Sequence, residues 1–137
     1  MNNIEEQILN GYVRDYYVEM ASYQLLGMML DESFVKERLN MFGITHMYIY
    51  GGTYMSIQLY RAGKKYTNIK GIVDKSGKIV LNEEIPVIIL KEFQNQYNGE
   101  KIIITPIRFY KEIVKELSSF VSEKDLISIG ELLLGVV

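Results

Sequence analysis

The chain of 137 residues contains no cysteine, no tryptophan and a single histidine. Without cysteine it forms no disulfide, offers no thiolate to a metal ion and has no cysteine nucleophile. One histidine, His46, excludes a histidine-rich metal site within one chain. Nucleophile elbows, phosphate loops and metal-ligand spacings are also missing. The sequence therefore predicts neither a metal site nor catalytic residues.

Strong charge of one sign and long apolar runs are missing too. The formal net charge is −2, so no basic field attracts nucleic acid. No apolar run approaches the ~20 residues that a membrane-spanning helix needs. The first residues lack the basic region and apolar run of a secretory signal. We expect a cytoplasmic protein with no nucleic-acid partner and no membrane span. The remaining composition, 48% hydrophobic and 23% charged, is typical of one globular domain.

Residues 1–42 are predicted to form an N-terminal helical segment. Its apolar residues recur at steps of three or four and form one stripe: Tyr12, Tyr16, Met20, Tyr23, Leu26 and Leu30. Gly11 and Gly27 weaken the pattern, so the segment is one long helix or two pieces. Asp31 and Ser33 are both suited to cap a further short helix, which Gly43 would end. The stripe is either core that packs on the domain or the interface of a homodimer, because aromatic residues and methionine are favoured in interface cores.

Residues 43–137 change to an alternation of strands and helices. Extended segments are predicted at 44–50, 68–73, 79–81, 86–90, 101–105 and 126–129, with helices near 55–60, 91–97, 109–120 and 131–134. The uninterrupted run Ile102–Ile104 suits a strand buried on both faces of a parallel sheet. Such alternation builds parallel sheets through right-handed crossovers. We predict an α/β, small Rossmann-like three-layer fold with a mostly parallel sheet of about five strands.

The candidate ligand site begins where the first strand ends, at Gly51. Dinucleotide-binding turns read G-x-G-x-x-G, whereas residues 51–56 read Gly-Gly-Thr-Tyr-Met-Ser. Thr53 puts a β-branched side chain where the backbone should approach a pyrophosphate, and Ser56 is a partial substitute for the third glycine. The helix that follows still offers free N–H groups and the positive end of its dipole. The turn therefore favours anion binding but weakens the prediction of tight dinucleotide binding.

Two residues outside the turn belong to the same predicted site. Asp74 closes the second strand 23 residues after Gly51, near the ~20 expected of an acid that binds an adenosine ribose. It suits equally well a turn beside residues 76–77. Thr105 ends the buried strand and faces the same edge, where its hydroxyl either contacts a ligand or, with Pro106, only ends the strand. The complete predicted site is Gly51, Gly52, Thr53, Tyr54, Asp74 and Thr105.

Two tyrosine–lysine pairs have the spacing used by short-chain dehydrogenases. Tyr60 and Lys64 follow the glycine turn, which is the wrong element for that chemistry. Tyr97 and Lys101 straddle a helix end, a turn and a strand start. In a chain with eleven tyrosines, we interpret both pairs as chance matches.

Several segments follow one another in a familiar order: Met47–Gly52, Ile69–Asp74, Ile85–Val87, Ile102–Pro106 and Tyr110–Ile113 with Leu117. Together they resemble small Rossmann-like domains attached to, or encoded beside, bacterial surface-polysaccharide enzymes. The resemblance covers roughly residues 35–134. It implies a nucleotide, NAD(P)-like or nucleotide-sugar ligand near Gly51, Gly52 and Asp74, and it does not identify the cofactor.

Two functions stay open at this point. The first is a nucleotide-binding module with a degenerate glycine turn, accessory to surface-polysaccharide biosynthesis. The second is a non-enzymatic interaction or scaffold domain whose nucleotide site is lost. A third alternative, a stand-alone oxidoreductase, is the weakest, because a chain of 137 residues leaves little room for a separate substrate domain. We do not expect the chain to be a complete enzyme alone.

Overall fold

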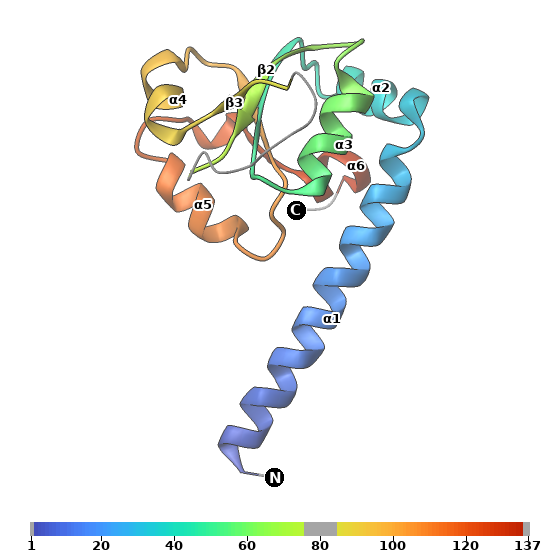
Figure 1. Ribbon diagram of the computed structural model, residues 1–137, viewed down its shortest axis with the longest axis vertical. Coiled ribbons are helices and arrows are strands. Elements are labelled where there is room, and N and C mark those ends of the chain that lie inside the picture. The colour runs from blue at the N-terminus through green and yellow to red at the C-terminus, as the bar shows by residue number, and fades with distance from the viewer. Residues whose placement is uncertain (1, 76–84, 136–137) are drawn as a thin grey trace.

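The computed structural model describes residues 2–75 and 85–135, and Figure 1 shows them as one α/β domain with a projecting N-terminal helix. The helices are α1 (Asn3–Met29), α2 (Glu32–Met41), α3 (Tyr54–Gly63), α4 (Leu90–Gln96), α5 (Tyr110–Leu117), the short 3-10 turn η1 (Glu123–Asp125) and α6 (Ile129–Leu134). The strands are β1 (His46–Tyr50), β2 (Asn68–Val73), β3 (Val87–Ile88), β4 (Lys101–Ile104) and β5 (Leu126–Ser128). The extended segment predicted at 79–81 and the turn at 76–77 lie outside the described residues.

All the described strands run parallel in one sheet, in the order β3-β2-β1-β4-β5. The chain moves outward from β1 through β2 to β3, then returns to build β4 and β5 on the other side of β1. Strand order therefore reverses between β1 and β4, and their carboxyl ends form the topological switch point of the sheet. The predicted Rossmann-like α/β fold is confirmed, and its sheet is parallel throughout the described residues.

Alternate side chains of the central strands fill two separate cores, one on each face of the sheet. Met47 and Ile49 point into the core shared with α1, α2, α3 and α6. Tyr48 and Tyr50 point into the core shared with α4 and α5. In this second core the Phe93 ring contacts three others edge-to-face, with centroids 4.8 Å from Tyr48, 5.6 Å from Tyr97 and 5.7 Å from Phe120. The three predicted layers follow from these two cores.

The N-terminal segment is two helices, and its break lies after both glycines of α1. Helix α1 runs unbroken through Gly11 and Gly27 and ends at Met29. The Asp31 side chain accepts a hydrogen bond from the Phe34 N–H at 3.2 Å and starts α2. Gly43 has a φ of +64°, the left-handed conformation expected where a helix ends.

Only the last turns of α1 belong to the core. Leu25 and Met29 are buried against the domain, at 3% and 0% exposed. Tyr12, Tyr16, Met20 and Tyr23 are exposed instead, so the interpretation of the stripe as core is wrong for these four residues, whereas Leu26 of the same stripe packs on the core. The face that packs carries Leu25 and Met29, positions that the tyrosine spacing does not mark. Most of α1 extends away from the domain toward a distant N-terminus (Figure 1).

An ion pair between exposed Lys70 and buried Glu100 marks the amino-terminal edge of the sheet. Glu100 accepts hydrogen bonds from the Lys70 ammonium at 2.7 Å and the Asn98 N–H at 2.8 Å. Burial alone would raise the pKa of this carboxyl, but the hydrogen bonds from Lys70 and the backbone outweigh burial and hold the pKa below its ordinary 4.5. Because the folded pKa is depressed, the carboxylate stabilises the fold above the ordinary pKa and loses that contribution as pH falls.

We therefore expect the free energy of unfolding to fall when the pH drops from about 6 to about 3, and to fall less steeply in Glu100→Gln. Urea denaturation across that range measures both slopes. Glu112→Gln, an exposed carboxyl on α5, should keep the wild-type slope. Equal slopes in wild type and Glu100→Gln would contradict this role of the pair.

Candidate functional site

The glycine turn lies at the switch point, wedged against the residues that follow β4. Gly51 has a φ of +122°, which favours glycine, and its N–H donates to the Val73 carbonyl at 2.9 Å. A Cβ on Gly51 would lie 2.6 Å from Pro106 Cδ and 2.7 Å from Thr105 Oγ1. Glycine is required here twice over, by its backbone conformation and by the close approach of Pro106.

Three hydroxyl side chains fill the space behind this turn. The Ser56 hydroxyl donates to the Gly51 carbonyl at 2.5 Å, and its oxygen lies 2.7 Å from Thr105 Oγ1. Thr105 Oγ1 also lies 3.1 Å from Thr53 Oγ1 and 3.2 Å from the Tyr50 carbonyl oxygen. Ser56 and Thr105 have no exposed surface. The network joins the glycine turn, the first turn of α3 and the end of β4.

The number of protons fixes the direction of this network. Each hydroxyl carries one proton. With the Ser56 proton on the Gly51 carbonyl, the Thr105 proton is shared between Ser56 Oγ and the Tyr50 carbonyl, which can only accept, and Thr53 donates to Thr105. Thr53 Oγ1 also accepts from the Ser56 N–H at 3.4 Å and caps α3. In this arrangement each hydroxyl donates inside the protein, and none donates to an incoming phosphate.

The remaining predicted site residues are more exposed. Gly52 is exposed, and the Tyr54 side chain is 83% exposed at the start of α3. Asp74 follows β2 at the same edge of the sheet, where its N–H donates to the Ile88 carbonyl at 3.0 Å. Burial first, and then the nearby carboxylates of Glu116 and Asp74, raise the pKa of Tyr50 to about 12. Asp74 therefore lies near Tyr50, one strand away from the hydroxyl network.

The structure thus brings Gly51, Thr53 and Thr105 together and adds two residues that the site prediction leaves out. Ser56 appears in the sequence only as a small substitute for glycine, yet its hydroxyl links the turn to Thr105. Pro106 was expected only to end a strand, yet it packs directly on Gly51. The sequence offers one sign of this role: Ser56 is a small polar residue at a position where α3 must pack closely on the strand.

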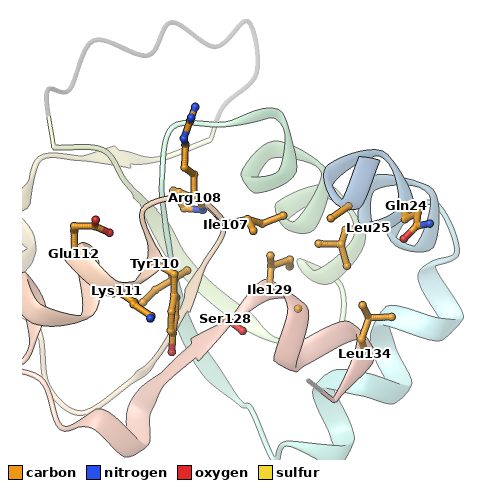
Figure 2. A pocket seen from close by; sticks show the side chains of 14 residues that line it. Gln24, Leu25, Ile107, Arg108, Tyr110, Lys111, Glu112, Ser128, Ile129 and Leu134 are labelled. Atoms are coloured by element: carbon orange, nitrogen blue, oxygen red, sulfur yellow. The ribbon is translucent and has the colours of Figure 1, made fainter. Parts of the chain in front are cut away.

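A separate cavity of about 440 Å³ lies at the carboxyl ends of β4 and β5 (Figure 2). Leu25 of α1, Ile107 of the loop after β4 and Ile129 of α6 form an apolar interior. Its lining does not include Gly51 or Asp74. The volume and the apolar lining are typical of small-molecule pockets.

Two polar side chains at the rim of this cavity, Arg108 and Ser128, have partners within the chain. Arg108 forms an ion pair with Asp15, which ties the loop after β4 to α1. The Ser128 hydroxyl oxygen accepts from the Glu131 N–H at 3.0 Å and caps α6. The cavity therefore offers mainly apolar contact, with hydrogen-bonding groups at its edge.

His46 and the two tyrosine–lysine pairs lie away from the switch point. His46 is exposed at the start of β1, at the opposite edge of the sheet. The Lys64 ammonium lies 5.9 Å from the centre of the Tyr60 ring. Lys101 contacts Asp125 at 2.8 Å, and the Tyr97 hydroxyl donates to the same carboxylate at 3.3 Å.

Two negative findings concern only the described part of the chain. In residues 2–75 and 85–135, no three His, Cys, Asp or Glu side chains gather in a way that suits a metal ion. Over the same residues, every helix is too short or too polar to cross a membrane. Comparisons with models of protein families, with curated proteins and with solved structures found no match.

Proposed function

We propose that this protein is a non-enzymatic protein-interaction module, built on a Rossmann-like domain whose nucleotide site is lost. The hydroxyl network of Thr53, Ser56 and Thr105 is the observation that supports this function. In dinucleotide-binding domains, the glycine turn and the helix N-terminus present free donors to the pyrophosphate. Here Pro106 packs on Gly51 and the Thr53 side chain caps α3, so the protein itself occupies these positions.

Helix α1 supplies the interaction surface in this proposal. Large contiguous apolar patches on a protein surface often mark sites of protein–protein interaction, whereas single exposed apolar residues are common and carry no such meaning. The projecting part of α1 carries such a patch, and self-association through the N-terminal helices belongs to the proposed function.

A nucleotide-binding module is the second candidate function, and one observation favours it. The cavity lies over β4 and β5, next to the switch point where Rossmann-like domains bind ligands. Its volume of about 440 Å³ suits part of a nucleotide or a nucleotide-sugar. NAD(P) is included among these ligands. An accessory role in surface-polysaccharide biosynthesis, predicted from the sequence resemblance, fits either candidate.

Thermal unfolding with a ligand panel distinguishes the two functions. The panel contains NAD⁺, NADPH, ATP, S-adenosylmethionine and UDP-sugars. A ligand present at about 100 times its Kd adds about 2.7 kcal/mol of stability, which raises Tm by roughly 8 °C in a domain of this size. We expect no ligand of the panel to shift Tm. A shift of several degrees would contradict the loss of the site.

Two variants would locate any ligand that did bind. Leu134→Trp fills the cavity from a position that is 47% exposed, so the larger ring is tolerated. Asp74→Asn removes the carboxylate beside the glycine turn while keeping the shape of the side chain. A Tm shift lost only in Leu134→Trp would place the ligand in the cavity. A shift lost only in Asp74→Asn would place it at the turn.

A further inference from the structure

Helix α1 carries large apolar side chains that are not buried by the domain, and the broad side of the helix that they cover, more than half of its circumference, is called its exposed face below. Nine of them are exposed to at least 42% of their surface: Ile4, Ile8, Leu9, Tyr12, Val13, Tyr16, Tyr17, Met20 and Tyr23. Leu25 and Met29 hold the last turns of α1 on the domain, and the Asp15–Arg108 ion pair ties the middle of the helix to it. Most of these side chains lie on the part of α1 that projects from the domain (Figure 1).

The charges of α1 argue against a membrane surface as the occupant of this face. Helices that lie on anionic membranes are rich in lysine and arginine. In α1 the single cation, Arg14, is outnumbered by Glu5, Glu6, Asp15 and Glu19. Tyrosine, which supplies four of the nine exposed side chains, is favoured in protein interfaces.

The exposed face has the area that a stable dimer needs. From Ile4 to Tyr23 the helix is about 30 Å long, at 1.5 Å per residue. With roughly 100–200 Å² for each large exposed side chain, the nine side chains offer on the order of 1,000 Å². Stable interfaces bury about 800 Å² on each partner. A second α1 could cover this face without help from another element.

We infer that the occupant is α1 of a second copy of this chain, packed antiparallel. An isologous contact requires residue i to meet residue j while j meets i. The exposed side chains satisfy this condition to within one residue, about a centre near residues 13 and 14. Their approximate antiparallel partners are Ile4 with Tyr23, Ile8 with Met20, Leu9 with Tyr17 and Tyr12 with Tyr16. Eight of the nine large side chains thus lie near another large side chain, and Val13 lies at the centre.

A parallel pair in register is disfavoured by charge. It would set Glu5, Glu6 and Glu19 each against its own copy, and like charges at close range are destabilising. It would also align the two helix dipoles in the same direction. In the antiparallel pair, Glu5 and Glu6 lie instead beside the uncharged residues Ala21 and Ser22. The two domains then lie at opposite ends of the helix pair.

Light scattering coupled to size exclusion tests the dimer. The wild-type chain should have about twice its mass of 15.9 kDa at micromolar concentrations. Tyr12→Arg with Tyr16→Arg places two charges at the centre of the interface and should raise the dimer Kd at least 100-fold. Gln7→Arg with Asn10→Arg makes the same charge change off this face and should change Kd less than about 3-fold. Circular dichroism confirms that both variants keep their helix content.

Disulfide trapping tests the orientation, and the absence of native cysteine makes the result unambiguous. Chains carrying Ile8→Cys are mixed with chains carrying Met20→Cys under mild oxidation. The antiparallel pair predicts a disulfide between the two different chains, and little between identical chains. Disulfides only between identical chains would overturn the antiparallel arrangement.

This inference rests on the proposed interaction function and names its partner. A wild-type chain that stays monomeric up to about 100 µM would overturn it, whether or not that chain binds phosphatidylcholine vesicles or another protein. If the chain proves to be monomeric, the dimer is ruled out, but the ligand panel still shows no shift in Tm and the lost nucleotide site stands. A nucleotide-dependent shift in Tm contradicts the lost site without dissociating the dimer, so the two failures are distinguishable.

Discussion

Gly51→Ala is expected to lower the free energy of unfolding by about 3–5 kcal/mol. A side chain at a φ of +122° is strained, and such strain costs about 1–3 kcal/mol. The new Cβ would also lie 2.6 Å from Pro106 Cδ, and overpacking of this kind costs about 1–3 kcal/mol. Pro106 has little freedom to move, because its ring is fixed at the end of β4. Urea denaturation measures the loss.

Gly99→Ala is the matched control for this prediction. Gly99 has a φ of +84°, but a Cβ there meets no atom within 4 Å. It therefore adds backbone strain without a clash and should cost about 1–2 kcal/mol. If both variants lose the same free energy of unfolding, Pro106 moves aside for the new Cβ. The space between Gly51 and Pro106 is then not tightly filled.

Thr105→Val is expected to destabilise the protein by about 2–4 kcal/mol, although the two side chains have the same shape. The substitution removes the acceptor for the Thr53 hydroxyl and the donor shared by Ser56 Oγ and the Tyr50 carbonyl. Ser56 is fully buried at this point, so water does not replace the lost partners without rearrangement. Thermal and urea unfolding report the change.

Thr105→Ser separates the hydroxyl from the methyl group. It keeps the oxygen that joins the network and removes only one buried carbon, so it should cost about 1 kcal/mol. Thr105→Val as stable as Thr105→Ser would mean that the hydroxyl network contributes little. In that case the space behind Gly51 would be open to a ligand donor, and the nucleotide-binding candidate would gain support.

The fold was predictable because each strand is signalled locally. The run Ile102–Ile104 has no polar position, and in the structure these residues are at most 1% exposed. Such a run fits only a strand with helices on both faces. Gly43 and Gly51 both have a positive φ and follow the ends of α2 and β1. Each glycine therefore predicts the end of its helix or strand to within a residue or two. The parallel direction of the strands followed from the alternation of strands and helices, whereas the order β3-β2-β1-β4-β5 was not predicted.

The state of the candidate site was less predictable. Sequence spacing brings Gly51 and Thr105 to the same edge, but it does not say what lies between them. Ser56 and Pro106 close that space through contacts between segments about 50 residues apart, which no local pattern encodes. For α1, periodicity identified an apolar stripe correctly, yet periodicity does not distinguish a face that packs on its own domain from one that stays exposed.

The position of β1 has a consequence for synthesis on the ribosome. In the finished sheet it is flanked on both sides, by β2 and by β4. Its pairing with β4 joins Met47 to Lys101, so one side of β1 stays unpaired until the chain has grown another 54 residues. Unpaired strand edges recruit other strands, and late non-local pairing slows folding. The nascent chain therefore passes through a stage in which its central strand is a sheet edge, the stage at which a chaperone would protect it most.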